Sequence, residues 1–496
     1  MLRIAVCLMC FFILISFSQS RVFARAHVTV SHAVNKKKGK YKRRRRPVGP
    51  RLYSGVPLKI YSKKTVVISP GVQYTEEIVS RNRWRVGIIH ADLTADSLHI
   101  ELCKSKESAS GMERVEELAR RIDSTTGESV IAAVNANYWR AGTKDVLGGA
   151  VHDGEIIGFD NVKQWSRFLV FRDGTFGVEP ESLSISVIPK NIPPFIVSKV
   201  NLRLSDSTIT LYNHYYGASV PLPDTVTKPV TIDSLYNIAS IIQHAHNPNA
   251  QSENKDTARI HYAQDTTELF YETDEDLIPL PDSLVQKPRS EQYTLKCAFI
   301  YIDSPFVNST LRCRITGTSI HAMPIPLRGG VFTFPRADSV SFRALRIGDT
   351  ISIECITTPL TSQPVKEMLM AGPRLVRSGK VSVETDQENF HKKSFINGSH
   401  ARTAIGISED QHEVVLVTVD RPMGTRKLGR PGIGLRDLAR ILVNESVFDA
   451  MNFDGGSSTT LVINKETVFP DTGVEFSRHV ASSLCIVRSK KKKKDP

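Results

Sequence analysis

Polar residues follow three apolar segments of the sequence, at the points where these segments are predicted to end as strands. The three residues are Asn135, Asp420 and Asp454. In open sheets that contain parallel strands, ligands bind at the carboxyl ends of the strands, and Asn and Asp are suitable groups for a site there. Asn and Asp are also common turn residues, so each of the three could be only a turn cap. Three such ends in one chain favour a binding or catalytic site.

The strongest candidate is the loop that begins at Asp454. Gly455 and Gly456 allow the backbone to turn sharply and to come close to a ligand. The hydroxyls of Ser457 and Ser458 follow, and with nearby amide groups they predict a concave anion-binding site. The alternative is a tight hairpin whose serines only satisfy the turn, and the local sequence leaves both open.

Two further segments have a similar character. Gly148 and Gly149 form a glycine pair, and Gly372 stands in an Ala-Gly-Pro-Arg turn. Arg402 begins a predicted strand, where a guanidinium can make bidentate contacts to phosphate or carboxylate. These segments predict turns that could line the same site.

Taken in order, these motifs resemble the phosphodiester glycosidase family. That family has a Pro-Gly-Val entry, an Asn-Gly-Gly strand end followed by aromatics, a glycine pair, a Gly-Gly-Pro turn, an Arg-Thr-Ala strand and a terminal Asp-Gly-Gly-Gly-Ser loop. The matching segments are Pro70-Gly71-Val72, Asn135-Ala136-Asn137-Tyr138-Trp139, Gly148-Gly149, Ala371-Gly372-Pro373-Arg374, Arg402-Thr403-Ala404-Ile405-Gly406 and Asp454-Gly455-Gly456-Ser457-Ser458. The resemblance runs from about residue 65 to 487 and skips 225–288. Each motif alone is weak, whereas the ordered set is specific.

The resemblance implies hydrolysis of the anomeric C–O bond of a sugar-1-phosphodiester. A phosphate monoester leaves readily, so the site mainly has to hold its charge, a role for Arg402 and the loop amides. An oxocarbenium-like transition state favours a nearby carboxylate, for which Asp454 is the first candidate and Asp420 the second. The residues expected to bind the substrate are Asn135, Asn137, Gly148, Gly149, Gly372, Thr403, Gly455, Gly456, Ser457, Ser458 and Arg478.

Further groups could take part in this chemistry. His152 or His400 could act as a general acid or base, although a lone histidine is more often structural. No cofactor is required. A divalent cation, Ca²⁺ or Mg²⁺, could be held by Asp454 and Asp420, because carboxylates suit both ions. The chain has no Cys-x-x-Cys pair, so a cysteine-based zinc site is not expected.

Two residues depart from the family pattern. Asn137 stands where the family has glycine, and Asn tolerates a positive φ better than most residues. Ser457 replaces the third glycine of the terminal loop and is expected to narrow the space beside Asp454. Both changes could reshape the pocket or mark an altered substrate.

Two rival functions remain open at this stage. The first is a catalytically silent protein of the cell envelope that binds carbohydrate, such as an acidic polysaccharide, in the same pocket. The second is a metal-dependent phosphoesterase that cleaves on the phosphorus side of the ester.

The elements that position these motifs are predicted from periodicity. Strands are expected within 55–102 and at 130–134, 168–171, 202–211, 293–302, 331–334, 350–355, 414–419 and 448–453. Amphipathic helices are expected at 112–122 and 435–443. Because each helix lies between strands, the fold class is α+β or α/β, a mixed β-sheet with helices packed on it. One main domain, 55–487, carries a polar insertion at 225–288.

Charge and hydropathy at the two ends predict export. Residues 1–26 resemble a signal peptide, with Arg3 before an apolar run and Ala24-Arg25-Ala26 as a cleavage site. An uncleaved anchor is the alternative. The net charge of +14 is concentrated in a basic segment at 27–54 and a basic tail at 488–496. The body between them is near neutral, which excludes a nucleic-acid-binding domain. The tails could contact an anionic envelope or acidic polymer, which leans towards a bacterial envelope or periplasm. The oligomeric state is not predicted.

Overall fold

The computed structural model describes residues 58–79, 84–160, 164–180, 182–202, 208–220, 294–335, 338–359, 363–420, 432–468 and 477–489. All of them belong to one compact unit that begins at Pro57. The predicted signal peptide, the basic segment at 27–54, the polar insertion at 225–288 and the lysine run at 490–494 lie outside the described residues.

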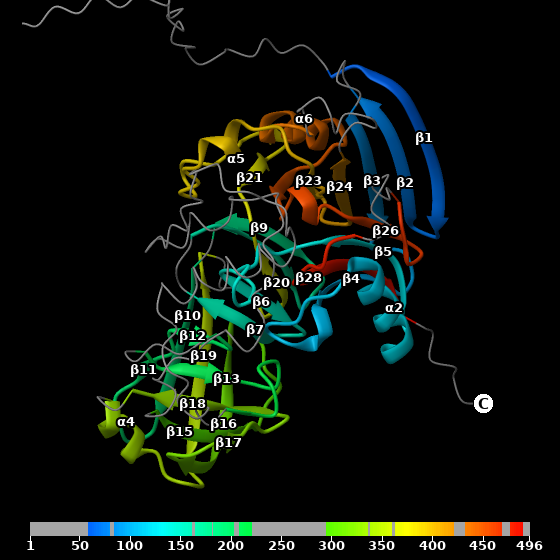
Figure 1. Cartoon of the computed structure of the whole chain (residues 1–496). Helices are drawn as coiled ribbons and strands as arrows, with labels where there is room; N and C mark the ends of the chain where they lie inside the picture. The colour runs from blue at the N-terminus through cyan, green and yellow to red at the C-terminus, as the bar shows by residue number, and fades with distance from the viewer. Residues whose placement is uncertain are drawn as a thin grey trace, which may run out of the picture. The chain divides into compact units, whose positions relative to one another are not determined.

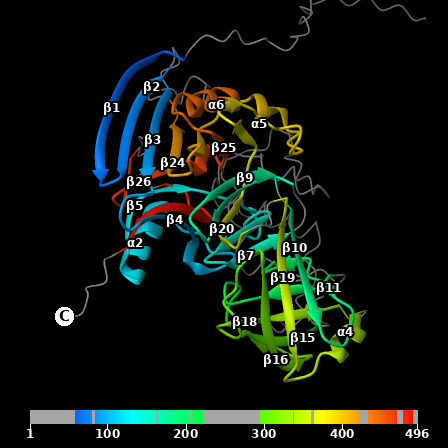
Figure 2. The ribbon, with the colours of Figure 1, turned by 180° about the vertical axis from the view of Figure 1, so that it is seen from behind.

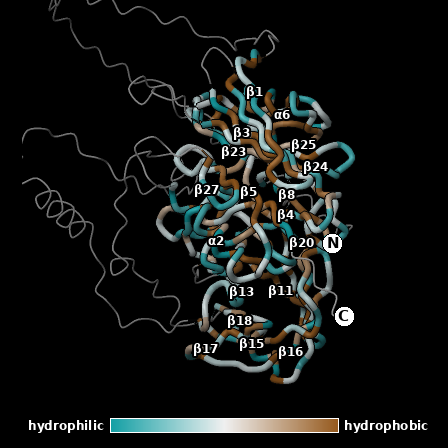
Figure 3. The backbone as a smooth tube through the Cα atoms, turned by 90° about the vertical axis from the view of Figure 1, so that its right-hand side faces the viewer, coloured by the Kyte–Doolittle hydropathy of each residue, from teal (hydrophilic) through white to brown (hydrophobic). Residues whose placement is uncertain are grey.

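The described part of the chain is made mostly of strands, with a few short helices (Figure 1). The fold still combines strands and helices, but β-sheet makes up a larger share of it than the sequence predicted. Hydrophobic stretches of the backbone follow the central strands (Figure 3). No helix among the described residues is long and apolar enough to span a membrane.

An eight-stranded sheet carries the late motifs. Its strands, in spatial order, are β1 (Ile60–Ser69), β2 (Val72–Val79), β3 (Trp84–Asp92), β24 (Glu413–Asp420), β23 (Arg402–Ile407), β25 (Asp449–Asn452), β21 (Arg374–Arg377) and β22 (Lys380–Val381).

A five-stranded sheet carries the early motif at Asn135. Its order is β27 (Glu466–Thr467), β26 (Leu461–Ile463), β5 (Ser129–Asn135), β28 (Ser482–Arg488) and β4 (Leu98–Lys104).

The largest sheet has thirteen strands. Their order is β11 (Phe195–Ile196), β10 (Ser182–Pro189), β19 (Thr350–Thr358), β16 (Ser309–Ser319), β15 (Leu295–Tyr301), β18 (Gly329–Phe334), β13 (Thr210–Tyr212), β12 (Lys199–Val200), β7 (Glu155–Asp160), β6 (Gly149–His152), β20 (Val365–Met370), β8 (Ser166–Phe171) and β9 (Phe176–Pro180). A second hydrophobic cluster is built from strands of this sheet, including β6, β7, β8, β10, β15 and β20. Figure 2 shows the ribbon of this sheet from behind. A two-stranded ribbon pairs β14 (Ser219–Val220) with β17 (Met323–Pro324).

The predicted helices are present and pack on sheets. They are α2 (Val115–Thr126) and α6 (Leu435–Asn444), with short additional helices α4 (Ser339–Ala344) and α5 (Lys393–Asn397). Helix α2 ends at Gly127, whose φ of 71° places it in the left-handed region that favours glycine. It packs on β5 and β28, and α6 packs near β21 and β24. Their apolar stripes cover the sheets, as the helical periodicity predicted.

Antiparallel pairing explains why the strand ends meet. Among the described strands only β12 and β13 pair in parallel. Strands β24 and β25 both pair antiparallel with β23, so β24 and β25 run in the same direction on either side of it. Their carboxyl ends, at Asp420 and Asn452, therefore lie at the sheet edge where β23 begins at Arg402. The predicted clustering of strand ends holds here without parallel pairing of neighbouring strands.

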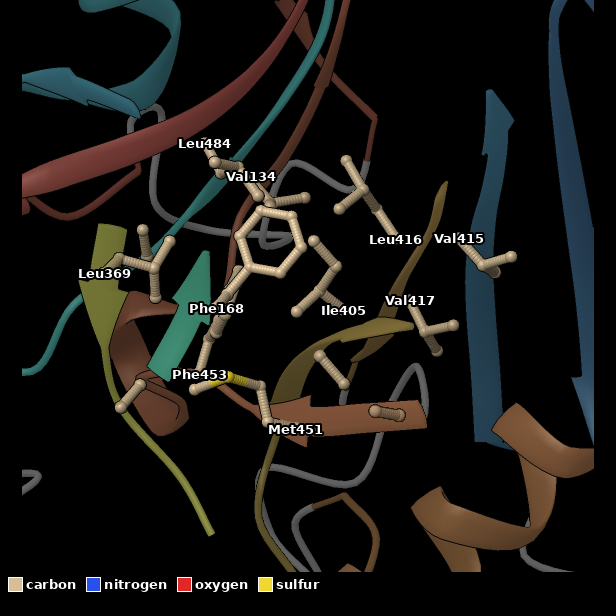
Figure 4. Packing of buried hydrophobic residues seen from close by; sticks show 14 of the residues in the cluster. Val134, Phe168, Leu369, Ile405, Val415, Leu416, Val417, Met451, Phe453 and Leu484 are labelled. Atoms are coloured by element: carbon tan, nitrogen blue, oxygen red, sulfur yellow. The ribbon is translucent and has the colours of Figure 1, made fainter. Parts of the chain in front are cut away.

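The hydrophobic core fixes the strand that precedes the Asp454 loop. Met451 and Phe453 are fully buried. Figure 4 shows both among core side chains that include Val134 of β5 and Phe168 of β8. Burial of a phenylalanine side chain contributes about 2 kcal/mol or more, so the residue before Asp454 is held firmly.

Candidate functional site

The Asp454 loop is held by backbone hydrogen bonds from both sides. The Asp454 N–H donates to the Ala136 carbonyl at 3.1 Å, and the Gly456 N–H donates to the Ala401 carbonyl at 2.8 Å. The loop continues as the 3₁₀ turn η6 (Gly456–Ser458). It is therefore fixed between the end of β5 and the start of β23.

Both loop glycines are required by this geometry. A Cβ on Gly455 would lie 2.8 Å from the Ala401 carbonyl oxygen, closer than such contacts allow. Gly456 has a φ of 62°, in the left-handed region. The sharp turn that the sequence predicted is present. The two glycines also let the loop lie against β23.

Asn135 ties the loop to both sheets. Its side-chain amide donates to the Asp454 carbonyl at 2.6 Å. Its Oδ1 accepts from the Thr403 hydroxyl at 2.7 Å and from the Thr460 N–H at 3.1 Å. Asn135 and Thr403 are fully buried, so these hydrogen bonds are shielded from water. Both residues form part of the support beneath the loop, and their predicted substrate-binding role stays a prediction.

Arg402 is buried in the same support. Its side chain is 1% exposed, and an Nη2–H donates to the Phe395 carbonyl at 2.8 Å. Its guanidinium lies 4.7 Å from the centre of the Phe395 ring. The guanidinium predicted to hold phosphate thus donates to the backbone of α5 in this structure. We call Asn135, Asn137, Arg402 and Thr403 the loop frame.

Asn137 completes the loop frame. It is 1% exposed, donates to the Met370 carbonyl at 3.0 Å, and accepts from the Ser482 hydroxyl at 2.8 Å. Its φ is not positive, so this position does not need the conformation that glycine favours. The first departure from the family pattern therefore leaves the local backbone unstrained.

Asp454 as a residue is partly exposed, although its carboxyl is surrounded by protein. Its Oδ1 accepts from the Gly455 N–H at 2.9 Å. Burial raises the pKa of Asp454 to about 6, and this outweighs the opposing effects of Ser458, Arg478 and Trp139. Such a carboxyl changes its charge near neutral pH, as functional carboxyls often do.

Exposed groups stand beside this carboxyl. The Arg478 Nη1–H donates to the Ser457 hydroxyl, and the guanidinium lies 5.1 Å from the centre of the Trp139 ring. Arg478 and Ser457 are exposed and Trp139 is half-buried. We call Asp454, Trp139, Ser457 and Arg478 the open rim. The second departure, Ser457, presents its side chain to solvent and to Arg478.

The comparisons with known proteins bear on this loop. Residues 317–487 match the family model of the phosphodiester glycosidases. This region is similar to the phosphodiester glycosidases. The resemblance that the motifs indicated is thus confirmed for the part that holds Arg402, Asp454 and Arg478.

Two known relatives of this chain share one enzyme name. The N-acetylglucosamine-1-phosphodiester alpha-N-acetylglucosaminidase of Bos taurus is 32% identical over 112 residues, which are 21% of this chain and 20% of that protein. The Homo sapiens enzyme is 31% identical over 112 residues, 21% of each protein. The alignment spans about one fifth of the length of these relatives.

Two solved structures share the fold. A hypothetical protein from Synechocystis superposes with a TM-score of 0.56 at 15% identity, covering 86% of this chain and 64% of that one. A Burkholderia pseudomallei K96243 protein has a TM-score of 0.52 at 13% identity, covering 83% and 74%. At these identities the likeness concerns the fold.

The glycines predicted for the phosphodiester glycosidase site serve packing. Gly148 has a φ of 75°, and a Cβ there would collide with Met370, while one on Gly149 would press against Met368. A Cβ on Gly372 would lie 2.6 Å from a carboxylate oxygen of Glu388. These glycines allow β6 and the turn after β20 to pack closely against their neighbours.

Asp420, His152 and His400 each face a residue that is not part of the open rim. Asp420 ends β24 opposite Arg85. Burial lowers the pKa of His152, but Glu367 outweighs it and raises the pKa to about 9. The His400 ring lies 3.1 Å from the Ser394 carbonyl. The catalytic roles of these three residues stay predictions.

Trp139 is the rim residue that sequence reasoning did not select. It occupies an aromatic position of the Asn135–Trp139 motif, and that position was the signal available for it. A pocket of about 470 Å³ between β1 and β24, lined by His90 and Glu445 among others, contains none of the predicted site residues.

Proposed function

We propose that the chain hydrolyses the anomeric C–O bond of a sugar-1-phosphodiester at the open rim. One observation carries the proposal. The carboxyl of the partly exposed residue Asp454 lies in the family's glycine loop with a raised pKa, beside an exposed guanidinium and an aromatic ring. The relatives' names describe the hydrolysis of such a diester, and the short alignment makes this activity a proposal for the whole chain.

Asp454 acts as the carboxylate that faces the anomeric carbon. The transition state of glycoside cleavage has oxocarbenium character and is stabilised by a nearby negative charge. With a pKa of about 6, Asp454 is ionised above that pH. Activity should therefore rise as the pH increases through about 6, if the ionised form is the one that reacts.

Arg478 and the Ser457 hydroxyl hold the phosphate. Three loop amides are already bonded within the protein, because Gly455 donates to Asp454, Gly456 to Ala401 and Ser458 to Gly455. The charge of the leaving group is therefore met by a side chain rather than by a nest of amides. A guanidinium matches a phosphate in both charge and geometry.

Trp139 provides a flat apolar surface for the sugar ring. Its ring is half-buried and lies beneath the Arg478 guanidinium, so a sugar on one part of it would place its phosphate near Arg478. An aromatic ring offers a large contact area that loses little conformational freedom on binding.

The loop frame positions this rim. Arg402 ties β23 to α5, and Asn135 ties the loop to β5 and β23. Both residues act by positioning Asp454 rather than on the substrate. Asp420 stays the second candidate for the catalytic carboxylate. Asp420 and Asp454 are also the proposed pair of ligands for a Ca²⁺ or Mg²⁺ ion. No cofactor is proposed as a requirement.

Export is part of the proposal. It rests on the apolar run after Arg3 and on the small-residue site at Ala24-Arg25-Ala26. The two basic tails would then keep the protein near an anionic envelope. A nucleic acid is not proposed as a partner.

The test is the release of free sugar from an N-acetylglucosamine-1-phosphodiester. Wild type should release it, and Asp454→Asn should lower kcat/KM by at least about a thousandfold. Asp386→Asn, which changes an exposed carboxylate outside the loop, is the matched control and should leave the rate unchanged. Binding of the diester without turnover by the wild type would contradict the enzyme and favour the carbohydrate-binding alternative.

A further inference from the structure

A second cluster of ligating side chains lies at the far end of β5 from the Asp454 loop. His99 and Glu101 project from β4, and Glu128 stands just before β5. His99 Nε2 lies 3.7 Å from Glu101 Oε2 and 3.7 Å from Glu128 Oε2. One ligand atom from each residue lies within 4.8 Å of the others, so the three atoms surround a common point.

The second polar atom of each residue has its own contact. The Ser489 hydroxyl donates to Glu128 Oε1 at 3.0 Å and lies 3.5 Å from His99 Nδ1. Glu101 Oε1 lies 3.5 Å from His152 Nε2. Three atoms therefore converge while the other atom of each side chain is held by a neighbour. Metal ligands in proteins are oriented by contacts of this kind.

A buried carboxylate holds the His152 ring in place. Its Nδ1 lies 3.1 Å from Glu367 Oε2, and Glu367 is 1% exposed. The contact between His152 and Glu101 is thus backed by a buried carboxylate of β20. The cluster joins elements that are distant in the sequence.

We propose that His99, Glu101 and Glu128 bind one divalent transition-metal ion, with Zn²⁺ as the best fit. Zn²⁺ accepts imidazole nitrogen and carboxylate oxygen at about 2.0–2.2 Å, which places neighbouring ligand atoms roughly 3.4 Å apart in a tetrahedron. The two separations from His99 are 3.7 Å and need to close by a few tenths of an ångström, and the separation between the two carboxylates is within 4.8 Å. Ca²⁺ and Mg²⁺ prefer sites made of oxygen alone, so the imidazole selects against them.

The charges and exposure also fit this ion. Two carboxylates and a neutral imidazole balance the two positive charges of Zn²⁺. The side chains of His99, Glu101 and Glu128 are 30%, 14% and 29% exposed, so water can complete the coordination. A three-ligand site of this type binds the ion from solution without rearrangement of the core.

The bound ion links β4 to the residue that precedes β5. Strand β5 ends at Asn135, so Glu128 and the residue beneath the Asp454 loop stand about 20 Å apart along the strand. The inference is therefore independent of the proposed hydrolysis. Binding to the folded state alone should raise the melting temperature when Zn²⁺ is present.

The experiment is a titration of the metal-free full chain with Zn²⁺ in competition with a chromogenic chelator. Wild type should bind one equivalent, and His99→Ala should weaken binding at least about a hundredfold. His321→Ala, which removes an exposed histidine elsewhere, is the matched control and should bind like wild type. Equal affinity of wild type and His99→Ala would overturn the proposal, as would the absence of stoichiometric binding by the wild type.

Two further variants separate loss of the site from loss of the fold. Glu128→Gln keeps the size of the side chain and removes a ligand charge, and it should weaken binding while its melting temperature without metal stays near that of wild type. Ser489→Ala leaves all three ligands in place and should weaken binding about tenfold. If Zn²⁺ raises the melting temperature of Glu128→Gln as much as that of wild type, the assignment is wrong.

Discussion

Two arginines at the Asp454 loop show how differently the loop frame and the open rim are built. Arg402 is 1% exposed and donates to a backbone carbonyl, whereas Arg478 is exposed and lies over Trp139. Arg402 belongs to the most recognisable motif, yet it faces the protein. The motif residues of the loop frame hold the backbone in place, and the groups available to a substrate stand on the open rim. A conspicuous motif residue therefore need not be the one that meets the ligand.

The largest expected stability difference is between these two arginines. Arg402→Ala should lower the free energy of unfolding by about 3 kcal/mol, because it leaves a cavity beside Phe395 and an unpaired carbonyl. Arg478→Ala should change it by less than about 0.5 kcal/mol, as surface substitutions usually do. Urea denaturation of both variants measures the difference. Similar losses in the two variants would remove the distinction between loop frame and open rim.

Asp454→Asn should stabilise the protein at high pH while it abolishes activity. The pKa of Asp454 is raised from 3.8 to about 6 in the folded state, so the ionised carboxylate destabilises the fold above pH 6. The variant should gain about 1–2 kcal/mol at pH 8, after allowance for partial exposure, and nothing near pH 3, where the wild-type carboxyl is protonated in both states. Denaturation at both pH values tests this. A gain that does not depend on pH would show that burial of the charge is not its cause.

Arg478→Gln should affect substrate binding more than the chemical step. Loss of the guanidinium removes a charge-assisted contact to phosphate, worth roughly tenfold in KM, with kcat changed less than about threefold. The change should be smaller for a substrate that carries no phosphate charge. Steady-state kinetics on the phosphodiester gives both constants, and an unchanged KM would place the phosphate elsewhere.

Asp420→Asn is expected to have the smallest effect on kcat/KM. Asp420 ends β24 opposite Arg85 and is not part of the open rim, so kcat/KM should fall less than about threefold. A loss of a hundredfold or more would make Asp420 a second catalytic carboxylate, or a ligand of a required cation. Repeating the assay with added Ca²⁺ or Mg²⁺ separates these two results.

The sequence predicted the local elements well where periodicity was strong. The apolar run at 130–134 is β5, the run at 414–419 is β24, and the helices at 112–122 and 435–443 correspond to α2 and α6. These succeed because burial of one face imposes a period on the residues. The helix at 112–122 was placed three to four residues too early, because its N-cap is Arg114, which is not a usual N-cap residue. Gly127 is the usual kind of signal for its C-terminus.

The long-range arrangement of the strands could not be predicted from the sequence. Nothing in the local pattern of β23, β24 or β25 says that β23 lies between the other two and makes their ends meet. Exposure was equally hidden, because Arg402 and Arg478 look alike in a sequence and differ only in which backbone surrounds them. Trp139 was visible as an aromatic position of a motif, but its place beneath a guanidinium depends on residues more than 300 positions later.

The central claim is that the open rim cleaves the C–O bond at the anomeric carbon. Hydrolysis of an N-acetylglucosamine-1-phosphodiester in oxygen-18 water tests it most directly, with mass spectrometry of both products. Attack at the anomeric carbon predicts the label in the sugar, in wild type and not in Asp454→Asn, which should show no turnover. Label in the phosphate would contradict the account and would assign the site to a phosphoesterase that cleaves on the phosphorus side.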